Sequence, residues 1–166
     1  LGQKYIEEGV TLNTGAHEVD VALYLFGRAW VVSACARKID PTRYGGDTIV
    51  DFVIEHENRV RSSFHLNSVT PNEIREFRVV GRDGDIYCDL PGRFVAQRSP
   101  DVKIPNISHF KPFHAPGSYD TDYLDEMCAF FDRIEGKDVH GATGEDGLNA
   151  LDILLEVRSK AGVAPR

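Results

Sequence analysis

The feature that most limits the fold is a pair of alternating runs of apolar and polar residues that lie almost end to end. In residues 47–56, DTIVDFVIEH, the side chains of Val50, Phe52 and Ile54 share one face of an extended chain. Residues 58–69, NRVRSSFHLNSV, alternate in the same way. Each run predicts a half-buried strand. Because so few residues separate the runs, the pair predicts a tight antiparallel hairpin.

Further strand patterns surround this hairpin. Residues 29–39 are rich in β-forming side chains, and residues 73–90 hold two strand patterns around the turn residues 82–84. Residues 93–98 form a last short pattern. Residues 99–118 carry four prolines and are too long and proline-rich for regular structure, so they predict a loop.

Three segments carry apolar residues at helical spacing: residues 14–26, 120–137 and 143–162. Asn13 or Thr14 is predicted to cap the first helix, because either side chain can accept a hydrogen bond from a free backbone N–H group. The third helix has an apolar stripe that consists of Leu148, Leu151, Leu154 and Leu155.

The order of these elements predicts the fold class. Gly27 is predicted to end the first helix and Thr143 to cap the third. Helices lie towards the two ends of the sequence and strands between them, which predicts an α+β fold with a large, mostly antiparallel sheet and helices on one face. The β–α–β alternation of a nucleotide-binding sheet is absent. We expect residues 1–166 to form a single domain.

Composition limits the partners that the chain can bind. The net charge of −7 gives no counterion-release affinity for nucleic acid, so DNA and RNA are not expected as partners. The chain has no basic cluster that would bind an anionic membrane. No apolar run in the sequence approaches the length of roughly 20 residues that a membrane helix needs. With no recognisable signal peptide, a cytoplasmic location is expected.

Neither disulfide nor metal chemistry is favoured by the sequence. The chain has three cysteines, Cys35, Cys88 and Cys128, which lie far apart in the sequence. We therefore expect these cysteines to behave as small buried apolar residues of a protein in a reducing compartment. His109 and His114 lie in the proline-rich segment without the further ligands that a metal site needs. A loop that covers the substrate is the preferred interpretation of that segment.

A polar row on the first helix is the main functional candidate. At 100° per residue, Asn13, His17, Asp20 and Tyr24 fall within about 60° of one another, between two apolar sectors. This arrangement predicts a row that faces a cleft. An imidazole such as that of His17 can accept the proton of a hydroxyl group near neutral pH. The alternative is a buried structural histidine with Asp20 as its partner.

A second polar set lies on the hairpin. Arg61, His65 and Asn67 share one face of the strand predicted within residues 58–69. We expect these side chains to be polar groups of a subunit interface, and contact with a polyol is the alternative.

Residues 9–27 resemble the segment that opens the C-terminal domain of the Gfo/Idh/MocA oxidoreductases. Residues 77–90 are similar to a strand–turn–strand of that family, and residues 147–162, which include Ser159, are similar to its closing helix. The matching positions in the opening segment are Gly9, Gly15, His17, Asp20 and the run Tyr24-Leu25-Phe26-Gly27.

The resemblance implies that this chain is the C-terminal substrate-binding and oligomerisation domain of a longer two-domain enzyme. An N-terminal Rossmann domain would bind NAD or NADP. The enzyme would transfer a hydride between the nicotinamide and a hydroxyl carbon of a sugar, inositol or similar polyol. The open face of the sheet would form a homodimer or homotetramer.

The same match assigns roles to single residues. His17 takes the position of the family histidine that acts as general base or substrate ligand. Asn13 stands where an aspartate is common, and it can only hydrogen-bond, so its role is contact with a substrate hydroxyl. Asp20 is a candidate substrate contact, and the preferred interpretation is a structural residue that orients the helix or His17. Tyr123, in the helix predicted over 120–137, is a further candidate for the substrate side of the cleft.

Two family features are missing from the sequence. No G-x-G-x-x-G follows a strand, and the lysine–proline motif of the Rossmann domain is absent. We therefore expect a fragment that is inactive by itself. Two other functions stay open: a redox-inactive ligand-sensing or assembly module, which Asn13 allows, and an NAD-using glycosidase of the same family.

Overall fold

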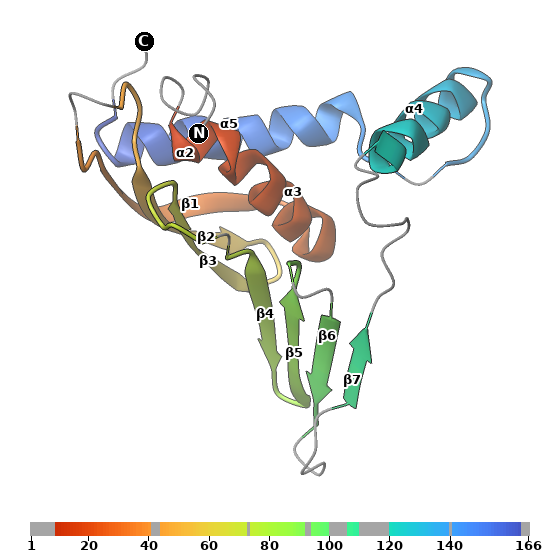
Figure 1. Cartoon of the computed structure of the whole chain (residues 1–166), viewed down its shortest axis with the longest axis horizontal. Coiled ribbons are helices and arrows are strands. Elements are labelled where there is room, and N and C mark those ends of the chain that lie inside the picture. Colours follow the sequence, from red (N-terminus) through yellow and green to blue (C-terminus); the bar gives the residue numbers. More distant parts are fainter. Residues whose placement is uncertain are drawn as a thin grey trace. The chain divides into compact units, whose positions relative to one another are not determined.

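The chain divides into two compact units, Leu1–Thr70 with Ala142–Arg166 and Pro71–Gly141, and each is described by itself. Figure 1 shows the computed structural model. It describes residues 9–40, 44–72, 74–91, 94–99, 106–109, 120–139 and 141–163.

The first unit combines a three-stranded sheet with helices packed on it. The strand order is β1-β2-β3, and both pairings are antiparallel. Helix α5 packs on β1, α3 packs on α5, and α2 contacts β2 and β3 (Figure 1). The elements are α2 (Val10–Asn13), α3 (Gly15–Phe26), β1 (Ala29–Arg37), β2 (Ile49–His56), β3 (Arg61–Asn67) and α5 (Gly144–Lys160).

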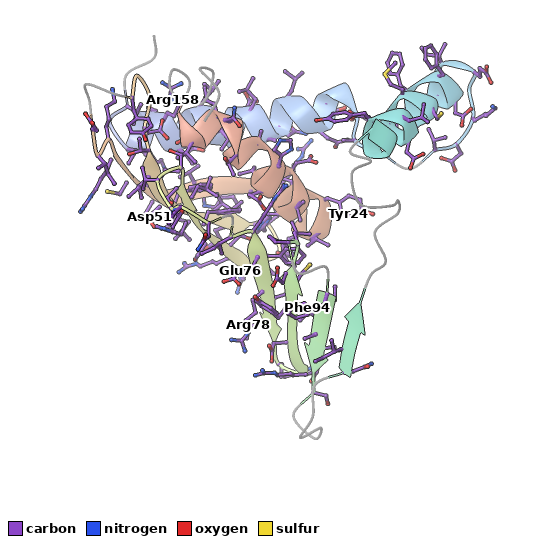
Figure 2. The ribbon with its side chains drawn as sticks, viewed as in Figure 1. Tyr24, Asp51, Glu76, Arg78, Phe94 and Arg158 are labelled. Atoms are coloured by element: carbon purple, nitrogen blue, oxygen red, sulfur yellow. The ribbon has the colours of Figure 1, made fainter. Side chains whose placement is uncertain are left out.

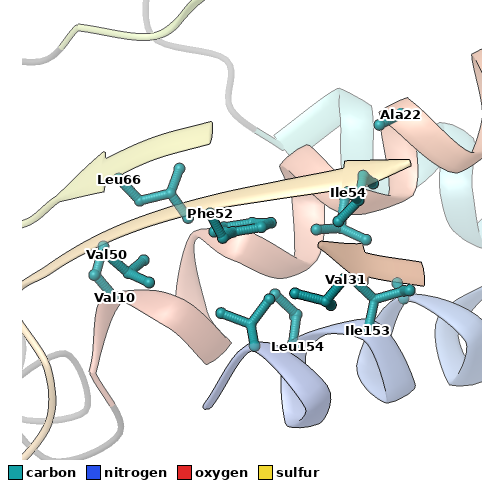
Figure 3. Packing of buried hydrophobic residues seen from close by; sticks show 12 residues of the cluster. Val10, Ala22, Val31, Val50, Phe52, Ile54, Leu66, Ile153 and Leu154 are labelled. Carbon is teal, nitrogen blue, oxygen red and sulfur yellow. The ribbon is translucent and has the colours of Figure 1, made fainter. Parts of the chain in front are cut away.

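A single apolar cluster joins the sheet to the helices in this unit. Figure 3 shows strand residues such as Val31 and Ile54 close to Leu154 of α5. The Phe52 ring stacks on Phe64 at a centroid distance of 4.4 Å. The cluster comprises Val10, Val19, Ala22, Val31, Val50, Phe52, Ile54, Leu66, Ala150, Ile153, Leu154 and Val157.

The predicted hairpin is confirmed. Strand β2 alternates buried and more exposed positions, with Val50, Phe52 and Ile54 in the core. The turn closes where the His56 backbone N–H donates to the Val60 carbonyl at 2.8 Å. The buried His56 ring also hydrogen-bonds to the Gly27 carbonyl oxygen at 2.8 Å. This hydrogen bond connects the turn of the hairpin to the end of α3.

The capping predictions are confirmed in part. Gly27 ends α3, with a φ of 80°. The Thr143 side chain accepts from the Asp146 N–H group in a capping box at the start of α5. The predicted cap by Asn13 or Thr14 is wrong, because neither side chain caps α3. The backbone of Thr14 is itself helical and continues from α2, a short helix that the sequence did not predict.

The apolar stripe predicted for α5 is not the side that packs. Leu154 is buried, but Leu148, Leu151 and Leu155 are exposed. The predicted stripe and the side that packs are both apolar, and both include Leu154. The helical spacing of apolar residues therefore could not show which of the two sides is buried. The side that packs on β1 and α3 is formed by Ala150, Ile153, Leu154 and Val157.

The second unit contains a four-stranded antiparallel sheet in the order β4-β5-β6-β7. The predicted turn lies at residues 82–83, between paired Gly81 and Gly84. Strand β7 was not predicted, and it corrects the expectation that residues 99–118 lack regular structure. The elements are β4 (Glu76–Gly81), β5 (Gly84–Asp89), β6 (Phe94–Arg98), β7 (Asn106–His109) and α4 (Asp120–Ile134).

The α+β class with antiparallel strands is confirmed, and the described strands form two sheets of three and four strands. Among the cysteines, Cys88 is buried as expected, but Cys35 and Cys128 are exposed, which corrects the prediction for those two. Burial raises the pKa of the Cys88 thiol, and the charge of Asp89 adds to this effect. In the part of the chain that the structure describes, no helix is long and apolar enough to cross a membrane.

A buried carboxylate holds the start of α2. Asp47 Oδ2 accepts from the Thr11 backbone N–H at 2.9 Å and from the Thr11 hydroxyl at 2.6 Å. Both residues are buried. The carboxylate therefore acts as an N-cap supplied by a residue 36 positions away.

Replacing Asp47 with alanine is expected to lower the free energy of unfolding by about 2–3 kcal/mol, because the buried Thr11 donors lose their acceptor. Urea denaturation measures this loss. Asp152→Ala is the matched control, because Asp152 is exposed on α5, and it is expected to change the value by less than about 0.5 kcal/mol. Equal effects of the two variants would contradict the capping role.

Candidate functional site on helix α3

The predicted polar row lies on the outer side of α3. The opposite side of the helix places Gly15, Val19 and Ala22 in the core. His17 is exposed, and Asn13 and Asp20 are half-buried. Tyr24, which Figure 2 labels, continues the row and is 85% exposed. The alternative of a buried structural histidine is therefore wrong.

A close helix contact fixes which side of α3 faces outward. A Cβ atom on Gly15 would lie 2.9 Å from Leu154 Cδ2 and 3.3 Å from Leu66 Cδ1. The absence of a side chain at Gly15 lets α3 approach α5 and the sheet closely. Since His17 is two residues further along, about 200° around the helix, it points away from that contact.

A second tight contact holds the segment that carries Asn13. Gly9 has a φ of 85°, and a Cβ atom there would collide with Asp47 Oδ1. The Val10 backbone N–H also donates to the Asp47 carbonyl at 2.9 Å. These contacts fix α2, and Asn13 is its last residue.

The row is chemically available for a ligand. Within the described residues, the side chains of Asn13, His17 and Asp20 have no hydrogen-bond partner. Residues three or four apart on a helix have Cβ atoms about 5–6 Å apart, so neighbouring members can share one small ligand. An amide, an imidazole and a carboxylate together offer hydrogen-bond donors, acceptors and a proton acceptor, which suit a molecule with several hydroxyl groups.

The exposed face of β1–β3 carries a polar network that the sequence predicted only in part. Arg61, His65 and Asn67 do share this face. The sequence did not reveal that His65 Nδ1 lies 2.7 Å from Asp51 Oδ1, nor that Arg61 Nε lies 2.6 Å from Glu55 Oε2. Figure 2 labels Asp51. Strand register could have found both pairs, because these residues are direct cross-strand partners.

The second unit has its own polar pairs on β4 and β5. Arg78 Nε donates to Asp85 Oδ2 at 2.9 Å, and the Tyr87 hydroxyl donates to Glu76 Oε2. Figure 2 labels Arg78 and Glu76 on β4. The Tyr87 ring also contacts Phe94. The Glu76 hydrogen bond, with smaller contributions from desolvation and nearby carboxylates, raises the pKa of Tyr87 to about 12.

This Tyr87 shift predicts a pH effect on the second unit. The phenol can donate to Glu76 and the phenolate cannot, so the stabilisation by this contact is present below pH 10.0 and is lost as pH rises through about 12. A spectroscopic titration should show one tyrosine that ionises near pH 12. That component should vanish in Tyr87→Phe and move down in Glu76→Ala; an unchanged titration in both variants contradicts the contact.

The remaining predicted substrate residue, Tyr123, belongs to a different unit from α3. Tyr123 is exposed on α4, in the second unit. The side chains of His109 and His114 lie outside the described residues, as does most of the predicted covering loop. Among the side chains that the structure describes, no group of three or more His, Cys, Asp or Glu residues could hold a metal ion.

The strands add a further limit on cofactor binding. Every strand pairing in the described parts of both units is antiparallel. A dinucleotide site of the Rossmann type needs parallel strands joined through a helix, so those parts supply no such unit. The described strands therefore offer no helix–strand cradle for the phosphates of a dinucleotide.

Comparison with known families decides the affiliation of the chain. Residues 2–87 match the family model described as the GFO/IDH/MocA C-terminal domain. The chain belongs to the Gfo/Idh/MocA family. The matched region includes Gly9, Gly15, His17 and Asp20, the positions that carried the resemblance. No curated protein matches the sequence.

Solved structures share the fold of this Gfo/Idh/MocA chain. An oxidoreductase from Agrobacterium radiobacter, solved with NAD+, L-tartaric acid and magnesium, is 18% identical with a TM-score of 0.79, and the match covers 96% of this chain and 50% of that one. UDP-N-acetylglucosamine 3-dehydrogenase from Acidithiobacillus ferrooxidans is 14% identical with a TM-score of 0.80, and the match covers 98% and 50% of the two chains.

A third similar structure is a 3-ketoreductase from Actinomadura kijaniata in complex with TDP-benzene and NADP. It is 14% identical with a TM-score of 0.70, and the match covers 92% of this chain and 47% of that one. The chain thus spans about half the length of the solved structures that it matches. At these identities the likeness shows the fold alone.

Proposed function

We propose that this chain is the C-terminal substrate-binding domain of a two-domain NAD- or NADP-dependent oxidoreductase. The whole protein transfers a hydride between the nicotinamide and a hydroxyl-bearing carbon of a sugar, inositol or similar polyol. A preceding Rossmann domain binds the dinucleotide. The observation that carries the proposal is the row of Asn13, His17 and Asp20, presented outward by a helix whose other side is fixed in the core.

In this proposal the chain's own residues handle the hydroxyl group. The bound nicotinamide supplies the hydride acceptor. His17 accepts the hydroxyl proton while the C–H hydride leaves and the carbon–oxygen bond becomes a carbonyl. Asn13 hydrogen-bonds to a substrate hydroxyl, and Asp20 contacts substrate or orients His17. Tyr123 is proposed for the same substrate side.

The proposed assembly is a homodimer or homotetramer through the exposed face of β1–β3. Trp30 and Val32 are large apolar residues that stay exposed on β1. The Asp51–His65 and Glu55–Arg61 pairs lie on the same face of the sheet. Aromatic side chains beside satisfied polar pairs are typical of subunit interfaces.

The test uses the full-length gene product that contains this chain. We expect the near-ultraviolet absorbance of reduced nicotinamide to rise when NAD+ or NADP+ is mixed with a substrate from a panel of sugars and polyols. The 166-residue chain alone is expected to be inactive. Ligand binding without any absorbance change would favour a ligand-sensing module, and cleavage of a glycoside without net reduction would favour a glycosidase. Either result contradicts the proposal.

A further inference from the structure

Strand β1 combines an aggregation-prone sequence with a position at the edge of its sheet. Residues 29–35, AWVVSAC, hold no charged residue, no proline and no glycine. Uncharged segments of this length with β-forming side chains readily pair with copies of themselves. In the described part of the chain, β1 is an end strand of the order β1-β2-β3. The N–H and C=O groups on its outer side can therefore form a ladder with β1 of a second molecule.

Two side chains of α5 occupy this outer side at Val31. The Val31 backbone N–H donates to Glu156 Oε2 at 3.4 Å, and the Val31 carbonyl accepts from Lys160 Nζ. Lys160 Nζ also lies 3.1 Å from Glu156 Oε1. Both backbone groups of one residue point to the same side of an antiparallel strand. The Glu156–Lys160 pair therefore takes the two hydrogen bonds that an added strand would make with Val31.

The fold holds this ion pair in place. Glu156 and Lys160 are four residues apart on α5, with the glutamate first, which is the favourable order for an ion pair on a helix. Val157 follows Glu156 and is buried, and α5 packs on β1 (Figure 1). The packed helix therefore brings both charged groups to the edge of the strand.

A second feature interrupts β1 at the same place. The register between β1 and β2 shifts between Val31 and Ser33, as at a β-bulge. Bulges and charged side chains, lysine above all, are features by which natural sheets prevent pairing between edges of different molecules. Their coincidence at Val31 indicates that this point of the edge is protected.

We propose that the Glu156–Lys160 pair blocks the edge of β1 against antiparallel pairing with β1 of a second copy of this chain. Pairing would require Val31 to exchange both of its α5 partners for the new strand, and it would remove the two charges from water beside that strand. In a symmetric pair of copies, each chain brings its own Glu156 and Lys160, so this cost arises twice. The block concerns the edge of the sheet, whereas the proposed assembly uses its face, so the inference does not rest on the proposed function.

A peptide-binding measurement tests this inference on the full-length gene product that contains the chain. The probe is a fluorescent peptide with the sequence of residues 29–37, kept in reducing buffer. Glu156→Ala with Lys160→Ala is expected to bind the peptide about tenfold more tightly than the wild type, because both backbone groups of Val31 become available for the ladder. Fluorescence anisotropy measures the affinity.

Three controls separate strand pairing from other effects. Asp152→Ala with Ser159→Ala changes two exposed positions of the same helix and should leave the affinity unchanged. A peptide N-methylated at consecutive residues keeps the side chains but lacks the ladder donors, so it should bind no variant. Lys160→Met removes only the ammonium group and keeps the apolar stem, so it should fold as the wild type does and show part of the gain.

Each outcome supports or overturns the inference. Far-ultraviolet circular dichroism and a cooperative thermal transition identify the variants that are folded, and if the double variant is unfolded, Lys160→Met decides. Tighter binding of the unmethylated peptide alone by the folded variants supports the inference. An affinity equal to that of the wild type in the folded variants, or equal binding of the methylated peptide, overturns it.

Discussion

Replacing His17 with alanine in the whole protein is expected to lower kcat by about 10²–10⁴-fold, the usual contribution of a general base. The proposal assigns the hydroxyl proton to this imidazole, and no other proton acceptor except Asp20 stands in the described row. Because His17 is exposed and does not pack in the core, the thermal midpoint should change little. Steady-state kinetics with a dinucleotide and a reactive polyol measure the effect.

The controls separate a catalytic from a structural role. Asn13→Ala removes a hydrogen bond to substrate and should act mainly on KM, whereas His17→Ala should act mainly on kcat. His17→Gln keeps hydrogen bonding but cannot take up the proton, so it should be nearly as slow as His17→Ala. Full activity of His17→Ala, or loss of activity that follows loss of folding, would rule out the assignment of His17 as base.

Replacing Leu154 with alanine is expected to lower the free energy of unfolding by about 2–5 kcal/mol, the largest stability loss that we predict. Leu154 is 1% exposed and belongs to the core cluster beneath α3. Truncation removes apolar contacts and leaves a cavity where α5, α3 and the sheet meet. Urea denaturation measures the loss.

A matched control lies next to it in the same helix. Leu155 is 48% exposed, so Leu155→Ala changes the same residue type with the same helix propensity and should cost less than about 0.5 kcal/mol. Similar losses for the two variants would mean that the packed side of α5 is assigned incorrectly.

A double-mutant cycle tests the contact that orients α3. In the wild-type background Gly15→Ala places a Cβ atom 2.9 Å from Leu154 Cδ2, which opposes the gain in helix propensity. In the Leu154→Ala background that atom is gone, so Gly15→Ala should be more favourable by about 1 kcal/mol. Additive effects would show that Gly15 and Leu154 do not limit the approach of α3.

Local sequence patterns were sufficient to predict most helices and strands of this chain. The period-2 alternation of residues 47–56 and 58–69 predicted β2 and β3, and the capping chemistry of Thr143 predicted the start of α5. These signals lie within a few neighbouring residues, so no tertiary information is needed to interpret them. The segregation of helices from strands was likewise enough for the α+β class.

Contacts between distant residues could not be predicted in this way. The Thr11–Asp47 cap joins residues 36 positions apart, and its existence depends on how the chain returns to α2. The buried side of α5 was also undetermined, because Leu148 and Leu151 are as apolar as the residues that pack. Strand β7 went unnoticed because its four residues gain their structure from pairing with β6 rather than from their own pattern.

The sequence by itself determined that Asn13, His17 and Asp20 form one row, because the helical period places residues three and four apart on the same side. Only the tertiary structure decided that the row faces outward. The missing side chain of Gly15 lets α3 settle against Leu154 and Leu66, and this contact, made by residues distant in the chain, turns the opposite side of the helix to the surface.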